Sequence, residues 1–175
     1  MHRWLQRALV LVSGLWLAAC GQVITLEYSA EDLNSKIRPL FPVSRNDDLL
    51  SVKLDQPEIV FNRAQNKLGL RFNVEAKSLG LTLRGRTLVE GVVEYRPANG
   101  SFYIASPAMT ELAISGVPDF VAKPLRKLIS FAADYALKDK PIYTFDPQNF
   151  KEQLARNHLN AVRISDNRLV VEVKI

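Results

Sequence analysis

The residue with the clearest chemistry in this 175-residue chain is its single cysteine, Cys20. It ends a short apolar run, Ala8–Ala18, that follows a basic start without acidic residues. A basic start, a short apolar run and small residues before a cleavage point are typical of a bacterial signal peptide. The run is too short to cross a bilayer of roughly 30 Å as a helix. We expect residues 1–19 to be a cleaved signal peptide and residues 20–175 to form one domain.

The stretch Leu17-Ala18-Ala19-Cys20 resembles the lipobox of bacterial lipoproteins. This resemblance implies that diacylglycerol modifies the Cys20 thiol, that cleavage precedes Cys20, and that the new amine is acylated. Gly21 stands where an Asp favours inner-membrane retention in enterobacterial lipoproteins, which implies an outer-membrane location facing the periplasm. The lipid anchor would make the membrane a partner, because each buried methylene contributes about 0.8 kcal/mol. An ordinary cleaved signal and an uncleaved anchor helix are the alternatives.

Few other residues suggest a reaction. His2 falls in the signal segment, which leaves His158 as the only histidine of the mature domain. A lone histidine near a helix end lacks the partners that orient a general base. Asp47-Asp48 does not continue into a calcium-binding loop, and zinc, nucleotide and hydrolase motifs are not found. We therefore expect no enzyme activity, no metal and no cofactor.

Two arginines are candidates for anion binding. Arg84 and Arg86 lie on the polar face of one predicted strand and are able to contact a lipid phosphate. The alternative is a solvated sheet face on which they oppose Glu90 or Glu94.

Charge and cysteine content narrow the class of protein. The chain has 23 Lys+Arg against 18 Asp+Glu, and removal of the signal takes two arginines and no acid, leaving a net charge of +3. Such a charge, spread along the chain, indicates solubility and no nucleic-acid partner. One acylated cysteine leaves no intramolecular disulfide, so burial of apolar surface must stabilise the domain.

The elements that position these residues follow from the hydrophobic pattern. Alternation of apolar and polar residues predicts strands. Pro57, Gly85 and Gly91 predict bulges or bends within them, and Arg45–Asp48 is expected to be a loop. The expected strands are residues 22–28, 50–61, 68–76, 79–95, 102–114, 142–145, 159–164 and 169–175. The inward face of the fifth is expected to carry Phe102, Ile104, Ser106, Ala108, Thr110, Leu112 and Ile114.

Three helices are expected. Ser29 begins an S-A-E-D sequence close to a capping box, so a helix should run from there to residues 38–41. Asp119 is expected to cap a long helix ending near Leu137, and Asp146-Pro147 to open a last helix to Asn157 with Phe150 and Leu154 inward. We expect roughly equal amounts of helix and strand, in an α+β fold with an antiparallel sheet.

The long helix carries more apolar surface than a narrow stripe. Its wide apolar surface predicts cover on more than one side, and some of its residues are candidates for lining a groove, although a plain core is the alternative. The candidate lining residues are Phe120, Val121, Leu125, Leu128, Phe131, Ala132 and Tyr135.

At the level of the whole mature chain, the sequence resembles the YceB-type bacterial lipoproteins, which have no assigned molecular function. The resemblance rests on the lipobox, the capped helix, the glycine-bent hairpins, the G-V-P-x-x-x-x-x-P-L helix, the Y-x-F-D-P segment and the terminal L-V-V-E-V strand. That family is similar to TULIP-like lipid-binding domains. The resemblance implies a long curved antiparallel sheet wrapped around the long helix, with short helices beside it, and it implies no catalytic residues.

These observations favour a non-enzymatic binder of a lipid or other apolar ligand in a groove between sheet and helix. The alternative is an envelope interaction or scaffolding module with a filled core, whose protein partner the sequence does not name.

Overall fold

The computed structural model describes residues 23–48 and 50–175. The predicted signal peptide and Cys20 lie outside the described residues. Strands hold more residues than helices, contrary to the expected equal share. The elements are β1 Val23–Ser29, α1 Ala30–Ile37, β2 Val43–Asp47, β3 Leu50–Asn62, β4 Lys67–Ser78, β5 Leu81–Arg96, β6 Ser101–Ile114, α2 Asp119–Leu137, β7 Tyr143–Thr144, α3 Phe150–His158, β8 Leu159–Ser165 and β9 Arg168–Lys174, with 3₁₀ turns at Arg38–Leu40 and Arg63–Gln65.

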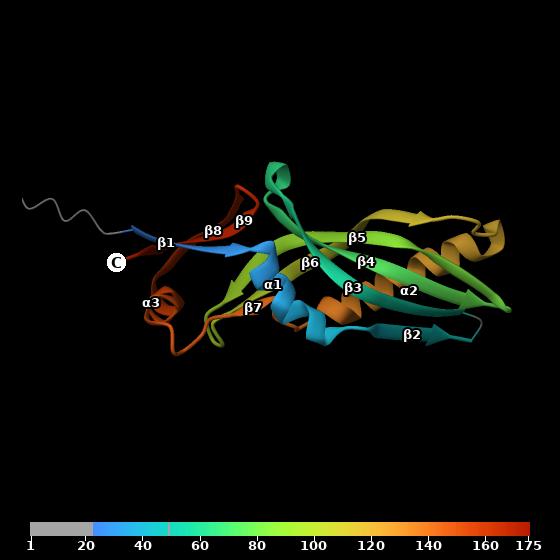
Figure 1. Ribbon diagram of the computed structural model, residues 1–175, viewed down its shortest axis with the longest axis horizontal. Helices are drawn as coiled ribbons and strands as arrows, with labels where there is room; N and C mark the ends of the chain where they lie inside the picture. Colours follow the sequence, from blue (N-terminus) through green and yellow to red (C-terminus); the bar gives the residue numbers. More distant parts are fainter. Residues whose placement is uncertain (1–22, 49) are drawn as a thin grey trace, which may run out of the picture.

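The strands form two open antiparallel sheets (Figure 1). The larger has the order β2-β3-β4-β5-β6-β7, and the smaller has the order β1-β9-β8. Neighbours in both sheets run antiparallel. The α+β class with antiparallel sheets is therefore confirmed.

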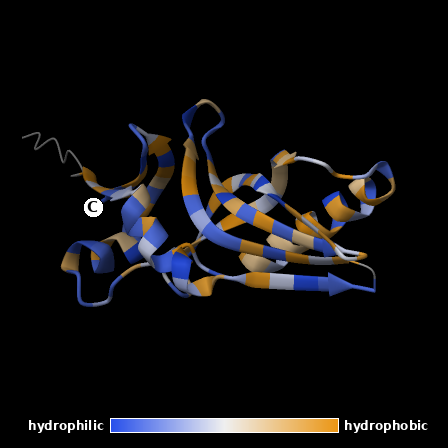
Figure 2. Ribbon diagram, turned by 45° about the vertical axis from the view of Figure 1, so that its right-hand side comes forward, coloured by the Kyte–Doolittle hydropathy of each residue, from blue (hydrophilic) through white to orange (hydrophobic). Residues whose placement is uncertain are grey.

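Strand β4 has the clearest alternation, as the sequence predicts. Its residues Leu68, Leu70, Phe72 and Ala76 are fully buried, while the residues between them mostly face outward. Figure 2 shows this change of hydropathy from residue to residue along the long strands. Because successive side chains of a strand point to opposite faces, such a pattern buries one face of the sheet.

The expected interruption near Pro57 is a bulge in β3. The pairing of β3 with β4 shifts between Asp55 and Glu58, and Gln56 has a φ of 50°. Here the buried Asn34 of α1 accepts a hydrogen bond from the Ile59 amide at 3.0 Å. The bulge is thus held by a side chain from the first helix.

Two further bulges change which face of β6 is buried. The β5–β6 register shifts between Glu90 and Val92 and again between Leu88 and Val89, each time with an extra residue on β6. Because one extra residue moves the following side chains to the opposite face, the sequence prediction is wrong in the middle of the strand. Ser106, Ala108 and Thr110 are exposed, and Met109 packs on the core in their place.

The helix starts differ in how well the sequence predicts them. The capping box at Ser29 and Asp32 is confirmed, with the Asp32 amide donating to Ser29 Oγ at 3.2 Å. Asp119 does not cap α2, because Pro118 occupies the N-cap and Asp119 is the first helical residue.

Two other predictions of local structure are wrong. Residues Arg45–Asp48 are no loop, because β2 runs to Asp47 and its backbone pairs with β3. Helix α3 begins at Phe150 after an Asn149 cap, and Phe150 is exposed. The inward positions of α3 are Glu152 and Ala155.

Helix α2 lies along one face of the larger sheet and touches β2, β3 and β6 (Figure 1). Its buried stripe joins the core formed by β3 and β4. That stripe consists of Val121, Leu125, Ile129, Ala132, Ala133, Ala136 and Leu137. Small residues in its C-terminal half let that half pack closely on the sheet, so the open space beside α2 lies at its N-terminal half.

Candidate functional site

The residues predicted to line a groove occupy three kinds of environment on α2. Val121, Leu125 and Ala132 belong to the buried stripe, and Leu128 is half-buried. Three aromatic side chains instead face outward: Phe120 is 68% exposed, Phe131 59% and Tyr135 50%. The seven residues therefore extend from the buried stripe of the helix to an exposed flank beside it, instead of lining one surface.

One cleft opens between α2 and the end of β6. Its volume is about 430 Å³. This volume lies within the range of roughly 300–1,000 Å³ that is typical of small-ligand sites. Its floor is the buried Leu125, and the half-buried Leu112 and Ile114 form one wall. Lys123 and Arg126 stand exposed at its rim. The complete lining is Leu112, Ile114, Val117, Ala122, Lys123, Leu125 and Arg126. We call it the α2–β6 cleft.

A second cleft lies on the other side of the same half of α2, and its volume is 330 Å³. It opens between the helix, the end of β2, the start of β3 and the turn that joins β4 to β5. Its rim carries carboxylates in place of cations. The lining is Asp47, Asp48, Leu50, Ser78, Leu79, Phe120, Val121 and Pro124. We call it the α2–β4 cleft.

The turn beside the α2–β4 cleft has an unusual residue. Two residues, Leu79 and Gly80, connect β4 to β5, with φ values of 47° and 81°. Positive φ at both positions belongs to the type I′ hairpin turn, where Asn-Gly is favoured. A leucine there is conformationally unfavourable, and its side chain is 69% exposed. Neither the turn conformation nor burial accounts for a leucine at this position, and Leu79 is one of the residues that line the α2–β4 cleft.

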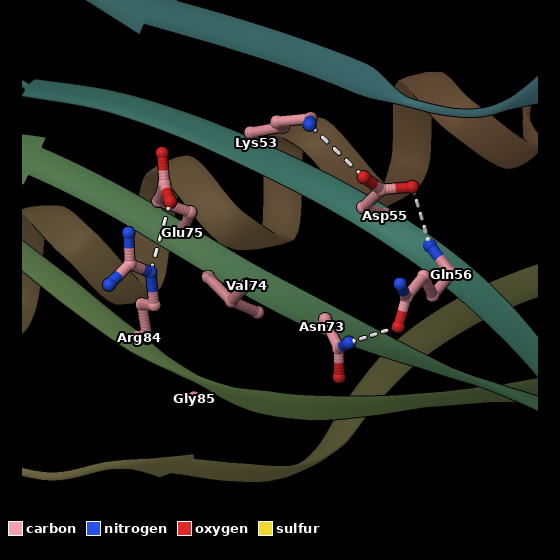
Figure 3. Close-up of a pocket in the computed structure, with 8 residues that line it drawn as sticks. All are labelled: Lys53, Asp55, Gln56, Asn73, Val74, Glu75, Arg84 and Gly85. Carbon is pink, nitrogen blue, oxygen red and sulfur yellow. Dashed lines mark hydrogen bonds and ion pairs between the residues drawn. The ribbon is translucent and has the colours of Figure 1, made fainter.

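The outer face of the larger sheet holds a polar hollow of 320 Å³ (Figure 3). Lys53 pairs with Asp55 at 3.0 Å, and Arg84 pairs with Glu75 at 3.1 Å. Arg84 thus meets a carboxylate on the neighbouring strand β4, and Glu90 and Glu94 have other partners, Asn62 and Arg96. This arrangement matches a solvated sheet face better than an anion site.

The sequence did not reveal a buried polar cluster that joins β1, β7 and α3. Glu152 is 5% exposed and accepts hydrogen bonds from the Tyr143 hydroxyl at 3.0 Å and the Asp146 amide at 2.6 Å. The Tyr28 ring lies 4.4 Å from that of Tyr143, and the Tyr28 hydroxyl has no hydrogen-bond partner among the described residues. Burial raises the pKa of both tyrosines, and the Glu152 carboxylate adds to the effect. These hydrogen bonds connect β7 and the segment after it to α3, so the cluster links elements of the fold.

Other candidate residues do not gather into a site. His158 is the last residue of α3 and is exposed. Within residues 23–48 and 50–175, no group of three His, Cys, Asp or Glu side chains is arranged to hold a metal ion. None of the helices in this part of the chain is long and apolar enough to cross a membrane.

Comparison with known proteins places the chain in a family. The sequence model of a family described as proteins of unknown function, DUF1439, matches residues 28–168. The chain therefore belongs to this family. The match begins in β1 and ends at the start of β9, so it includes both clefts. No curated protein matches the chain in sequence.

The sequence offered partial signals for the clefts. The apolar stripe of α2 located the helix, but its periodicity could not show that only the N-terminal half has open space on both sides. Leu79 followed by Gly80 was a stronger signal, because a leucine precedes glycine in a two-residue turn. Lys123 and Arg126 gave no signal beyond a charged helix surface.

Proposed function

We propose that the protein is an outer-membrane lipoprotein, anchored through acylated Cys20 and facing the periplasm, that binds a lipid or another apolar ligand without catalysing a reaction. The observation that supports this proposal best is the apolar open space on both sides of one half of α2. Clefts of a few hundred cubic ångströms with mostly apolar walls are typical of ligand sites.

The exposed apolar side chains beside the clefts support the same proposal. Leu79, Leu81 and Phe120 are 69%, 49% and 68% exposed, and Leu79 and Phe120 line the α2–β4 cleft. Each square ångström of apolar surface left exposed to water costs about 25 cal/mol relative to burial. A ligand that covers these side chains would recover part of that free energy.

We further propose that the chain is a YceB-type protein with a TULIP-like architecture, in which the larger sheet curves around α2. The contacts of α2 with β2, β3 and β6 support this arrangement. Strands β2 and β3 lie at one edge of the sheet and β6 lies near the other edge, so the helix touches strands from both halves of the sheet. The gap between helix and sheet at its N-terminal half would then be the entrance to the binding groove.

The binding proposal is tested with the domain from residue 20 onward, carrying Cys20→Ser. The core residues that the structure describes all lie between Tyr28 and Val173, so the tested segment contains all of them. Native mass spectrometry should detect co-purified lipid or uptake of an added single-chain lipid. A domain that carries no lipid and takes up none refutes the proposal.

A matched pair of variants locates the ligand. Ala122→Trp places a large side chain in the α2–β6 cleft, because Ala122 is exposed and lines it. Ser130→Trp adds the same side chain to an exposed position on α2 outside both clefts. We expect only Ala122→Trp to weaken ligand uptake at unchanged thermal stability.

A second candidate function is a docking module for an envelope protein. The observation that favours it is the outer edge of β6, where β7 pairs only with Ser101 and Phe102 and no described strand pairs with the rest. Open sheet edges accept extended peptides. A photo-crosslinking residue at Ala108 or Thr110, which are exposed positions of β6, should capture one dominant protein in cells if docking is the function.

A further inference from the structure

The two clefts beside α2 differ in charge. The α2–β4 cleft carries the carboxylates of Asp47 and Asp48, whereas the α2–β6 cleft carries Lys123 and Arg126. Both clefts have apolar walls and share the same helix, so charge is the property that best distinguishes their ligands. An anionic group would be attracted by the α2–β6 cleft and repelled by the α2–β4 cleft.

The two cations are positioned to act together. Lys123 and Arg126 are three residues apart on α2, which places them on one side of the helix. Both line the same cleft and both are exposed. Neither forms an ion pair with a carboxylate among the residues described, whereas Arg84, Arg96 and other cations do. Their charges are therefore available to a ligand.

The same cleft also has an apolar lining. Leu125 lies between the two cations in sequence and forms the buried floor, and Leu112 and Ile114 face it from β6. The edge of β6 from Tyr103 onward has no described neighbouring strand, so the cleft is accessible from that side. This is the layout that a molecule with one apolar chain and one anionic end requires.

We propose that the α2–β6 cleft binds a single long-chain fatty acid, with the acyl chain on Leu112, Ile114 and Leu125 and the carboxylate held by Lys123 and Arg126. The inference rests on the proposed function and makes it specific. A volume of 430 Å³ is at the small end of ligand sites, which favours one chain with a small headgroup over a glycerophospholipid. A guanidinium beside an ammonium supplies charge-assisted hydrogen bonds to a carboxylate.

The test uses probes of equal chain length and different headgroups. Dodecanoate, dodecyl phosphate and dodecylamine are titrated below their micelle concentrations into the Cys20→Ser domain that holds a fluorescent fatty acid. Dodecanoate should displace the fluorescent probe most effectively, and dodecylamine should displace it at least ~10-fold less well. Equal displacement by dodecylamine overturns the inference, and tighter binding of dodecyl phosphate overturns the choice of a carboxylate.

Variants at the rim test the residues. The double variant Lys123→Gln and Arg126→Gln should weaken dodecanoate binding ~10-fold or more, because it removes both positive charges that would donate hydrogen bonds to the carboxylate. Lys127→Gln is the matched control, since Lys127 is an exposed cation of α2 outside the cleft lining. Equal affinities in the double variant and the control contradict the assignment.

The two proposals fail in different ways. If no apolar probe binds the Cys20→Ser domain without further substitutions, the proposed function itself is refuted. If probes bind but their affinity depends neither on headgroup charge nor on Lys123 and Arg126, only the fatty-acid inference is refuted. Because both cations are exposed, their replacement should leave the thermal unfolding curve unchanged, which separates loss of binding from loss of folding.

Discussion

The guanidinium carbon of Arg45 lies 3.3 Å from the centre of the Tyr135 ring. This contact joins β2, at one edge of the larger sheet, to the C-terminal half of α2. The Lys140 ammonium lies 5.2 Å from the same ring. Tyr135 is half exposed, but its face is covered by a cation, so it fastens the helix to the sheet and does not line an open cleft.

Removing this cation–π contact should lower the stability of the domain. Arg45→Gln and Tyr135→Leu are each expected to lower the free energy of unfolding, and a double-mutant cycle should give a coupling energy of about 0.5–1 kcal/mol at this partly exposed site. Urea unfolding monitored by circular dichroism measures it. Simple additivity of the two substitutions would show that the contact contributes nothing.

Leu79→Asn should stabilise the domain and weaken ligand binding. Asparagine tolerates the left-handed conformation that Leu79 adopts at φ 47°, so the free energy of unfolding should rise by about 1 kcal/mol. Loss of the exposed leucine beside the α2–β4 cleft should reduce uptake of apolar probes there. Leu81→Asn, at a neighbouring exposed position in β5, is the control and should show no gain in stability.

Gly85→Ala should destabilise the larger sheet. A Cβ atom at Gly85 would collide with the Ala113 carbonyl oxygen and the Ile114 side chain of β6. Backbone cannot yield as a flexible side chain can, so we expect a cost of about 1–3 kcal/mol in thermal or urea unfolding. Thr82→Ala, on the exposed part of β5, should cost less than about 1 kcal/mol. A similar cost at both positions would contradict a close approach at Gly85.

Alkaline solution should destabilise the domain through the buried tyrosines. Burial, and then the Glu152 carboxylate, raise the pKa of Tyr28 and Tyr143 above the usual value near 10.0. Above about pH 10 the unfolded chain loses these protons while the folded chain keeps them, so the free energy of unfolding falls as pH rises. Below that pH their contribution is fully present. Urea unfolding at about pH 8 and about pH 11 measures the difference.

Phenylalanine variants separate the two tyrosines. Tyr28→Phe should reduce the alkaline loss without cost at neutral pH, because the Tyr28 hydroxyl has no hydrogen-bond partner among the described residues. Tyr143→Phe removes the bond to Glu152 and should cost about 1–3 kcal/mol at neutral pH. Equal losses at neutral pH would indicate that Tyr28 also binds Glu152.

Local sequence signals predicted much of the fold. The alternation in β4, the capping box at Ser29 and the interruption at Pro57 each depend on residues close in the chain, and each is confirmed. Strand β2 was missed because its five residues, V-S-R-N-D, are mostly polar and pair only along the edge of the sheet.

The remaining errors have non-local causes. Gly91 correctly indicated the irregularity between Glu90 and Val92, but the extra residues that the bulges add to β6 depend on its pairing with β5. Alternation alone could not place them, so Ser106, Ala108 and Thr110 were assigned to the wrong face. Phe150 was expected inside because it is aromatic, but the buried position of α3 belongs to Glu152, whose partners lie on other elements. The pairing of Arg45 with Tyr135 likewise depends on tertiary contact between segments far apart in sequence.

The pairing of β1 with β9 determines at which end of the molecule an N-terminal anchor would attach. Val23 opposes Lys174, so both ends of the described chain lie together, and the N-terminal half of α2 lies at the opposite end of the elongated molecule (Figure 1). Three Cα steps separate Cys20 from Val23, which allows at most roughly 11 Å. If Cys20 is acylated as proposed above, this short connection would place the β1–β9 end of the domain next to the bilayer and the clefts at the far end.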